Sequence, residues 1–179
     1  MSFTLNISVF GDKNVGKSKL IEDYTSQPSI SKTKKKQDFI SFQKTVDKIT
    51  MKLTIYEYSD VPKAKKDIAN HHCVIIIFDM TSRQSFEDVL DKWVKFLREI
   101  KYNNTIILFG TINYNNTKAL PMTDEEEIKE LIEVAEIKGT FHDIGNKDSK
   151  AKNELIDNLI ETSYEEAKNN INKKDCVVF

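Results

Sequence analysis

The sequence is poor in cysteine, proline and glycine, with two, three and five of them among 179 residues. Two cysteines do not make a disulfide framework, and a reducing cytosolic setting is the simpler interpretation. No apolar run approaches the ~20 residues that a membrane-spanning helix needs. The opening stretch MSFTLNISVF has neither a basic segment nor a small-residue cleavage site, which argues against a signal peptide.

An excess of charge of one sign is also absent, because the formal net charge is -1 at pH 7. This balance excludes a strong overall electrostatic case for nucleic-acid binding. The chain has two arginines, Arg83 and Arg98. Their scarcity disfavours a small kinase acting on ATP, because such an enzyme clamps phosphates with arginine-rich lids. The remaining composition, 39% hydrophobic and 31% charged, fits one globular domain with a sizeable core.

The stretch GDKNVGKSKL, residues 11–20, fits the phosphate-loop pattern G-x-x-x-x-G-K-S. It follows a predicted strand over Thr4–Phe10 and precedes a helix predicted to begin near Lys17, which is the context that the motif requires. Glycines let backbone N–H groups approach phosphate oxygens, and the helix N-terminus favours negative charge. We expect Lys17 to reach the terminal phosphates and Ser18 to offer its hydroxyl to Mg²⁺. The predicted phosphate-binding residues are Gly11, Asp12, Lys13, Asn14, Val15, Gly16, Lys17 and Ser18.

Further strand patterns follow along the chain. Apolar and polar residues alternate from Ile49 to Tyr56, which predicts a strand with one buried face. The runs CVIIIFD and TIILFG are apolar almost throughout, as in strands that are covered on both faces. Asp47 and Lys48 are expected at the turn of a hairpin. The predicted strands are residues 4–10, 38–46, 49–57, 73–79, 105–110 and 139–143.

Helix patterns alternate with these strands. Apolar residues recur at helical spacing over residues 86–100. Thr123 and Glu126 predict a capping box at the start of the next helix. A last helix is expected over residues 153–168.

Strands that alternate with helices predict an α/β domain with a six-stranded, mostly parallel sheet and helices on both faces. One domain is expected over residues 1–168, followed by a flexible tail over residues 169–179. His71 and His72 precede the strand CVIIIFD and are interpreted as surface or capping residues, since no further metal ligands are evident near them.

Two segments resemble the Ras superfamily of small GTPases, closest in pattern to its Rab and Ras branches. GDKNVGKSKL is similar to the family's GDxxVGKSxL, and FDMTSRQSFEDVLDKW at residues 78–93 is similar to its YD[IL]Tx..SFxxxxxW. The order of strands and helices agrees from Thr4 to about Lys168. The resemblance implies the P-loop NTPase fold of a small G domain, with the nucleotide at the carboxyl ends of the strands. It also implies GTP or GDP with Mg²⁺ as ligands, and effector proteins and exchange factors as partners.

The segment that resembles the family's second switch departs from the pattern. The family's W-D-T-A-G-Q falls on residues 56–61, YEYSDV. Glu57 replaces the aspartate that holds Mg²⁺ through water, and a longer carboxylate can still do so with altered geometry. Asp60 replaces the glycine whose backbone N–H contacts the γ-phosphate, and a carboxylate there repels the anion. Val61 replaces the glutamine that orients the attacking water, which predicts impaired hydrolysis.

The first switch is irregular as well. Counting back from Asp38, the family's Mg²⁺-binding threonine falls on Lys34, with Thr33 one residue away. Either Thr33 moves into place or that ligand is missing. The basic run KTKKK, residues 32–36, is either a solvated loop or a surface that attracts anions. The predicted metal ligands are Ser18, Thr33 and Glu57.

Base recognition departs too. The family's N-K-x-D falls on residues 111–114 directly after Gly110, or on residues 113–116 after a shift of two. Even after the shift, the aspartate that accepts two guanine N–H groups has become asparagine, with one acceptor and one donor. Discrimination for guanine should therefore be weak. The family's S-A-K falls on residues 145–147, whose backbone donors to the guanine oxygen can survive. The predicted base-binding residues are Asn113, Asn116, Asn146 and Lys147.

The residues CVVF at 176–179 fit the prenylation box C-a-a-X, and the final phenylalanine indicates a geranylgeranyl group on Cys176. A prenyltransferase is then a partner, and a single lipid chain gives reversible attachment to the cytoplasmic face of a membrane.

Two functions stay open. The first is an atypical membrane-anchored small GTP-binding protein with impaired hydrolysis, in signalling or vesicle traffic. The second is a pseudo-GTPase scaffold that binds nucleotide weakly or not at all.

Overall fold

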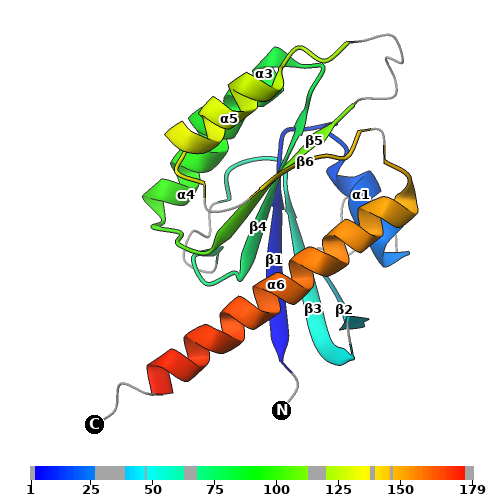
Figure 1. Cartoon of the computed structure of the whole chain (residues 1–179), viewed down its shortest axis with the longest axis vertical. Helices are drawn as coiled ribbons and strands as arrows, with labels where there is room; N and C mark the ends of the chain where they lie inside the picture. Colours follow the sequence, from blue (N-terminus) through cyan, green and yellow to red (C-terminus); the bar gives the residue numbers. More distant parts are fainter. Residues whose placement is uncertain are drawn as a thin grey trace.

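The computed structural model describes residues 3–26, 39–46, 48–62, 68–112, 120–137, 140–145 and 147–175. Its six strands form one sheet in the order β2–β3–β1–β4–β5–β6 (Figure 1). The strands are β1 (Thr4–Phe10), β2 (Phe39–Val46), β3 (Ile49–Tyr58), β4 (Cys73–Asp79), β5 (Thr105–Thr111) and β6 (Phe141–Asp143). Strands β2 and β3 pair antiparallel and the other neighbours pair parallel, which confirms the predicted sheet.

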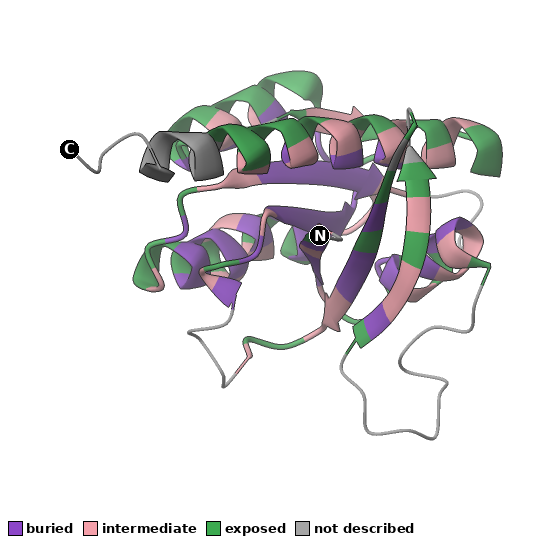
Figure 2. Ribbon diagram, turned by 90° about the horizontal axis from the view of Figure 1, so that it is seen from below, coloured by how far each residue is buried: buried purple, intermediate pink, exposed green. Residues whose placement is uncertain are grey.

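Helices cover both faces of this sheet. Helices α1 (Lys17–Thr25) and α6 (Ser149–Asp175) pack on one face. The other face carries α3 (Arg83–Asp88), the π-helical segment η2 (Val89–Val94), α4 (Lys95–Glu99) and α5 (Glu125–Val134). Figure 2 shows the central strands buried between the helices, whose outer faces are exposed. The domain is therefore a sheet with one apolar core on each side, as the sequence predicts.

Strand β4 shows why its sequence has no polar residue before its aspartate. All seven of its residues are buried. Cys73, Ile75 and Ile77 join the core beneath α1 and α6. Val74, Ile76 and Phe78 join the core beneath α3 to α5. Successive side chains point to opposite faces, so a central strand with two cores needs apolar residues at every position.

The hairpin between β2 and β3 turns near the predicted residues. Lys48 has a φ of 69°, in the left-handed region that tight turns use. Asp47, the other predicted turn residue, lies outside the described residues.

The helix predicted over residues 86–100 is present, but its middle is π-helical. Helix α3, segment η2 and helix α4 follow one another without a break from Arg83 to Glu99. A π turn holds one more residue than an α turn and re-aims the side chains within it. In η2, Trp93 lies flat against Phe10, the last residue of β1, with ring centroids 5.3 Å apart and an interplanar angle of 9°.

The capping box of α5 lies one residue later than predicted. Asp124, not Thr123, is the N-cap, and its carboxylate accepts the N–H groups of Glu126 and Glu127 at 3.0 and 2.9 Å. The Glu127 carboxylate accepts the Asp124 N–H at 3.3 Å. Thr123 is buried, with 6% of its surface exposed. The prediction of a Thr123–Glu126 box is therefore wrong, because the same spacing fits both pairs and burial takes Thr123 away from the helix end.

His71 is buried, so the prediction that it is a surface or capping residue is wrong, whereas His72 is only partly buried. His71 is 2% exposed, its Nδ1 lies 2.6 Å from the Ser8 Oγ, and its ring lies 4.4 Å from the Tyr56 ring. The His72 Nδ1 accepts the Asn6 N–H at 3.1 Å, and burial lowers the pKa of His72. Both rings dock on the sheet at the start of β4, which fixes how that strand enters beside β1.

Helix α6 is longer than predicted. It begins at Ser149 rather than Asn153 and continues to Asp175 rather than ending at Lys168, so it covers part of the predicted tail. Asp157 fastens it to its neighbours, since it accepts the Tyr24 hydroxyl at 2.5 Å and lies 3.1 Å from the Lys44 ammonium. Figure 1 shows α6 running past the edge of the sheet. Over the described residues, none of the helices carries a long enough apolar stretch to cross a bilayer.

Candidate functional site

The phosphate loop, residues 11–18, joins β1 to α1 at the carboxyl end of the sheet. Gly11 passes so close to β4 that a Cβ atom there would lie 2.2 Å from the Ile77 carbonyl oxygen. Gly16 caps α1 with a φ of 98°, which glycine adopts without a Cβ clash. The path of the loop therefore requires both glycines of the motif.

Lys17 is held within this loop. It is 3% exposed, and its ammonium donates to the carbonyl oxygens of Gly11 and Asp12 at 2.8 and 2.6 Å. Burial lowers the pKa of Lys17 to about 8, although the carboxylates of Glu57 and Asp12 act to raise it. The loop thus keeps a desolvated cation among its backbone groups, and a phosphate oxygen is the partner that such a cation favours.

The structure places two of the predicted metal ligands side by side. The Ser18 hydroxyl donates to Glu57 Oε1 at 2.5 Å, and Glu57 lies on β3 beside Val9 of β1. The other carboxylate oxygen, Oε2, is buried and has no hydrogen-bond partner in the described part of the chain. A buried carboxylate oxygen without a partner costs free energy, and Mg²⁺ prefers oxygen ligands. Ser18 and Glu57 therefore fit the ion that the sequence predicts.

The third predicted metal ligand, Thr33, lies outside the described residues together with the basic run 32–36. Within the described ranges, no group of three histidine, cysteine, aspartate or glutamate residues forms a ready-made metal site. An ion held by Ser18 and Glu57 would thus depend on the phosphate oxygens of a nucleotide for much of its coordination.

The residues after β3 bring negative charge to the phosphate loop. Asp60 and Val61 are exposed, Val61 by 40%. The Asp60 carboxylate is close enough to Lys17 to act on the pKa of that lysine, in the raising direction. Val61 contributes no group that can hold a water molecule by a hydrogen bond. Of these two departures from the family pattern, Asp60 therefore lies near the loop that binds phosphate, and Val61 follows it in the chain.

A second lysine, which no sequence motif marks, also reaches the loop. Lys92 of η2 donates to the Asp12 carboxylate at 2.8 Å and to the Ser59 carbonyl oxygen at 3.5 Å. One feature of the sequence could have indicated it. The family segment has five residues between its phenylalanine and its tryptophan, whereas this chain has six between Phe86 and Trp93. The π turn accommodates this extra residue.

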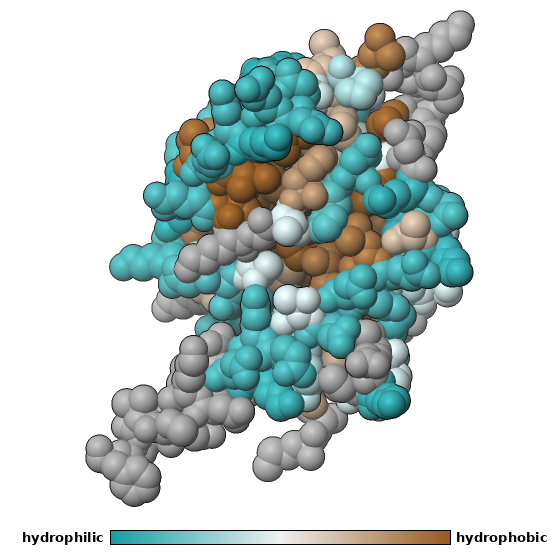
Figure 3. Space-filling model, in the orientation of Figure 1, coloured by the Kyte–Doolittle hydropathy of each residue, from teal (hydrophilic) through white to brown (hydrophobic). Residues whose placement is uncertain are grey.

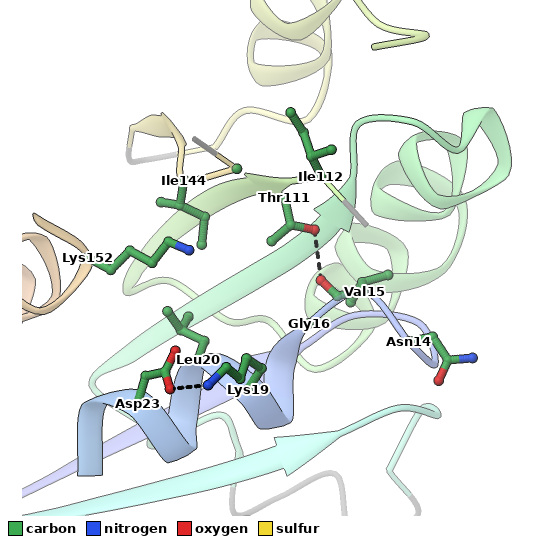
Figure 4. Close-up of a pocket in the computed structure, with 11 residues that line it drawn as sticks. Asn14, Val15, Gly16, Lys19, Leu20, Asp23, Thr111, Ile112, Ile144 and Lys152 are labelled. Atoms are coloured by element: carbon green, nitrogen blue, oxygen red, sulfur yellow. Dashed lines mark hydrogen bonds and ion pairs between the residues drawn. The ribbon is translucent and has the colours of Figure 1, made fainter. Parts of the chain in front are cut away.

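A cavity of about 300 Å³ adjoins the phosphate loop between α1, the end of β5 and the start of α6 (Figure 4). Leu20, Ile112 and Ile144 give it apolar walls. The Thr111 hydroxyl donates to the carbonyl oxygens of Val15 and Phe78 at 2.8 and 3.1 Å, which ties the phosphate loop to the sheet. The full lining is Asn14, Val15, Gly16, Lys19, Leu20, Asp23, Thr111, Ile112, Ile144, Gly145 and Lys152.

This cavity lies where the sequence predicts base recognition, but the described residues around it differ from the predicted ones. Asn113, Asn116 and Asn146 lie outside the described residues. Lys147 is exposed and is not part of the lining. Lys152 of α6 lines the cavity instead, and Figure 4 shows its amino group pointing inward. No motif marked Lys152, because its place depends on how α6 docks.

Comparison with protein families gives one assignment. The model of the Ras family matches residues 6–165, a span that includes the phosphate loop, Glu57 and the cavity. A search of curated proteins finds no significant match.

Proposed function

The chain belongs to the Ras family of small GTPases, and we propose that it is an atypical member that binds GTP and GDP through their phosphates and hydrolyses GTP very slowly or not at all. One observation carries the proposal: the phosphate loop is complete, while the Asp60 carboxylate lies near it and a valine follows where the family has glutamine. Lys17 and the Ser18–Glu57 pair support binding. Asp60 and Val61 oppose hydrolysis.

Binding follows from the loop itself. Backbone N–H groups at the start of α1 and the Lys17 ammonium are donors for phosphate oxygens. Bound Mg²⁺ would neutralise charge between the phosphates. Glu57 and Ser18 would hold it, and the buried Glu57 Oε2 would then gain the partner that it lacks among the described residues.

Slow hydrolysis follows from the residues after β3. The attack of water on a γ-phosphate requires a group that orients the water, and Val61 has none. The Asp60 carboxylate adds negative charge near Lys17, where the transition state also accumulates negative charge. Both effects raise the barrier to hydrolysis without removing the groups that bind phosphate.

The binding part is tested by titrating the purified full chain with fluorescently labelled GDP, GTP and ATP in the presence of Mg²⁺. We expect GDP and GTP to bind at micromolar protein or below. If none of the three nucleotides binds at micromolar protein, this proposal is overturned. The chain would then be a pseudo-GTPase scaffold.

The hydrolysis part is tested by single-turnover assays on the wild type, Val61→Gln and the double variant Asp60→Gly with Val61→Gln. The single variant should stay within about tenfold of the wild type, because Asp60 still opposes the γ-phosphate. The double variant should be clearly faster than the single one. A large rate gain in Val61→Gln alone would contradict this account of Asp60.

A second candidate is a pseudo-GTPase scaffold that binds nucleotide weakly or not at all. The cavity favours it, because Ile112 lines the wall and, in the unshifted alignment, stands at the position of the lysine in the family's N-K-x-D. An isoleucine side chain supplies no hydrogen bond that identifies a base. The titration above decides between the two, since a scaffold would show no saturable nucleotide binding.

Membrane attachment through Cys176 is a further part of the proposal, and this residue lies outside the described part of the chain. It rests on the CVVF sequence, and it implies a prenyltransferase as partner and reversible residence on a cytoplasmic membrane face, in signalling or vesicle traffic. Cys176→Ser should move the protein from the membrane fraction to the cytosol without changing its melting temperature. Unchanged fractionation would argue against a lipid anchor.

A further inference from the structure

Lys92 connects three parts of the molecule that are distant in sequence. Its ammonium pairs with the Asp12 carboxylate of the phosphate loop at 2.8 Å and reaches the Ser59 carbonyl oxygen after β3 at 3.5 Å. It also lies 4.4 Å from the centre of the Trp93 ring. Both members of the ion pair are partly buried, with 28% and 21% of their side chains exposed, so water screens the pair less than an open surface pair.

The position of Lys92 is fixed by the π turn around it. Trp93, its neighbour in η2, is 1% exposed and stacks on Phe10, the residue that precedes the phosphate loop. Since this stack holds the helix against the start of the loop, the Lys92 stem needs no rearrangement to meet Asp12. A chain without the extra residue in this turn would direct position 92 elsewhere.

The contact between Lys92 and Asp12 lies among several acidic groups that surround the phosphate loop. Asp12, Glu57 and Asp60 all act on Lys17, each in the direction that raises its pKa. In the family pattern the position of Asp60 is a glycine whose N–H contacts the γ-phosphate, so the triphosphate itself draws this segment to the loop. Here a carboxylate stands at that position, and Lys92 provides a cation that attracts both the loop and the segment.

We infer that Lys92 is a positioning residue that holds residues 59–61 against the phosphate loop whether or not nucleotide is bound. In this respect it does what the γ-phosphate does in the family. The segment should therefore lie in nearly the same place in the free, GDP-bound and GTP-bound protein. The part of this inference that concerns bound states rests on the proposed function, and the part that concerns the free protein does not.

The free protein is tested first, by amide hydrogen exchange on the full chain after removal of nucleotide. Lys92→Met keeps the stem over Trp93 and removes the charge, so the peptide covering residues 57–62 should exchange about fivefold faster. Lys92→Arg should retain wild-type exchange. Lys95→Met, an exposed residue of the same continuous helix, is the matched control and should change nothing. Unchanged exchange in Lys92→Met would overturn the inference, as would equal acceleration in β4 peptides.

The Asp12 partner is tested by a double-variant cycle. Asp12→Asn should speed exchange of the same peptide, and the double variant with Lys92→Met should add little to either single change, because both remove one interaction. Additive effects would show that Asp12 is not the partner through which Lys92 acts, and would overturn the inference.

Nucleotide-bound states complete the test. In the wild type, exchange of the 57–62 peptide should differ less than about twofold between GDP and a non-hydrolysable GTP analogue, whereas Lys92→Met should show a larger difference. A large difference in the wild type would overturn the inference. If the wild type binds neither nucleotide, the proposed function fails, and the exchange of the free protein still decides whether Lys92 holds the segment.

Discussion

The two ends of the proposed nucleotide site are built differently. At the phosphate end, Lys17 and Ser18 belong to one short loop, and Lys92 reaches that loop from η2. Their hydrogen bonds there are 2.5 to 2.8 Å long. At the base end, Leu20, Ile112 and Ile144 form apolar parts of the wall, and polar side chains such as Asp23 and Lys152 also line the cavity. Phosphate binding uses mostly backbone geometry, which a short motif encodes. Base selection uses particular side chains from several loops, so a few substitutions can remove it.

Thr111 joins the two ends. Its hydroxyl bonds the Val15 carbonyl of the phosphate loop, while Thr111 itself and Ile112 line the cavity. In the unshifted alignment this residue stands first in the family's N-K-x-D, directly after Gly110. A role in supporting the loop can therefore persist at a position whose neighbours no longer resemble the base motif. The contrast between the ends can be tested by changing each one separately.

The largest effect is expected from the phosphate end. Lys17→Met removes the cation held at the loop, and GDP affinity should fall about 100-fold or more, because charge-assisted bonds to phosphate are lost. Competition with labelled GDP measures the change, and Lys95→Met serves as the control for loss of a positive charge. A loss below about tenfold would mean that the phosphate end is not the main source of affinity.

The affinity for GDP should also depend on pH through the protonation of Lys17. The pKa of Lys17 in the free protein is about 8, and a bound phosphate raises it because it favours the charged form. Affinity for GDP is then fully present below pH 8 and falls as the pH rises above it, by about tenfold or more between pH 7.5 and 9.5. The guanine of GDP ionises in the same way in assays of the wild type and of Lys17→Met. The variant should therefore lack the part of the fall that is due to the lysine. Parallel slopes in the two proteins would contradict the assignment.

A smaller effect is expected where the two ends join. Thr111→Val keeps the shape and removes the donor to the Val15 and Phe78 carbonyls, so the free energy of unfolding should drop by about 1 kcal/mol. GDP affinity should fall a few-fold, because the loop loses its support. Urea denaturation and competition binding measure both changes. Thr45→Val, at an exposed hydroxyl of β2, is the matched control; equal effects in the two variants would remove the special role of Thr111.

The smallest effect is expected at the base end. IDP lacks the 2-amino group of guanine, and it should bind within about threefold of GDP, because no aspartate stands at the motif position that accepts from this group. Competition against labelled GDP on the wild type gives the ratio directly. If IDP binds about 100-fold more weakly than GDP, the base end recognises guanine by groups outside the described residues, and the contrast between the ends is wrong.

The sequence predicted most of the sheet and the phosphate loop, because both depend on local patterns. The unbroken apolar run of β4 and the alternation in β3 translate directly into burial on two faces or one. The predicted helices are also present, with changes at their ends. The capping box of α5 was misplaced by one residue because two overlapping pairs satisfy one spacing, and only burial of Thr123 distinguishes them.

Contacts between distant residues could not be predicted in this way. Lys92 and Asp12 are separated by 80 positions, and their meeting depends on a π turn that helical periodicity does not reveal. Lys152 reaches the cavity because α6 docks on α1. His71 is buried because its ring packs against Ser8 of β1 and Tyr56 of β3. Each of these places is a property of packing, and the residues involved look like ordinary polar residues in the sequence.

Because Trp93 stacks on Phe10, intrinsic tryptophan fluorescence should report on the phosphate loop. Trp93 is the sole tryptophan of the chain; its ring stacks on Phe10, the residue before the phosphate loop, and its centre lies 4.4 Å from the Lys92 ammonium. Indole emission responds to nearby charge and to ring contacts, so its wavelength and intensity should follow any displacement of the loop or of Lys92. Stopped-flow fluorescence of the unlabelled protein can therefore time events at the phosphate end without a dye or an added probe residue.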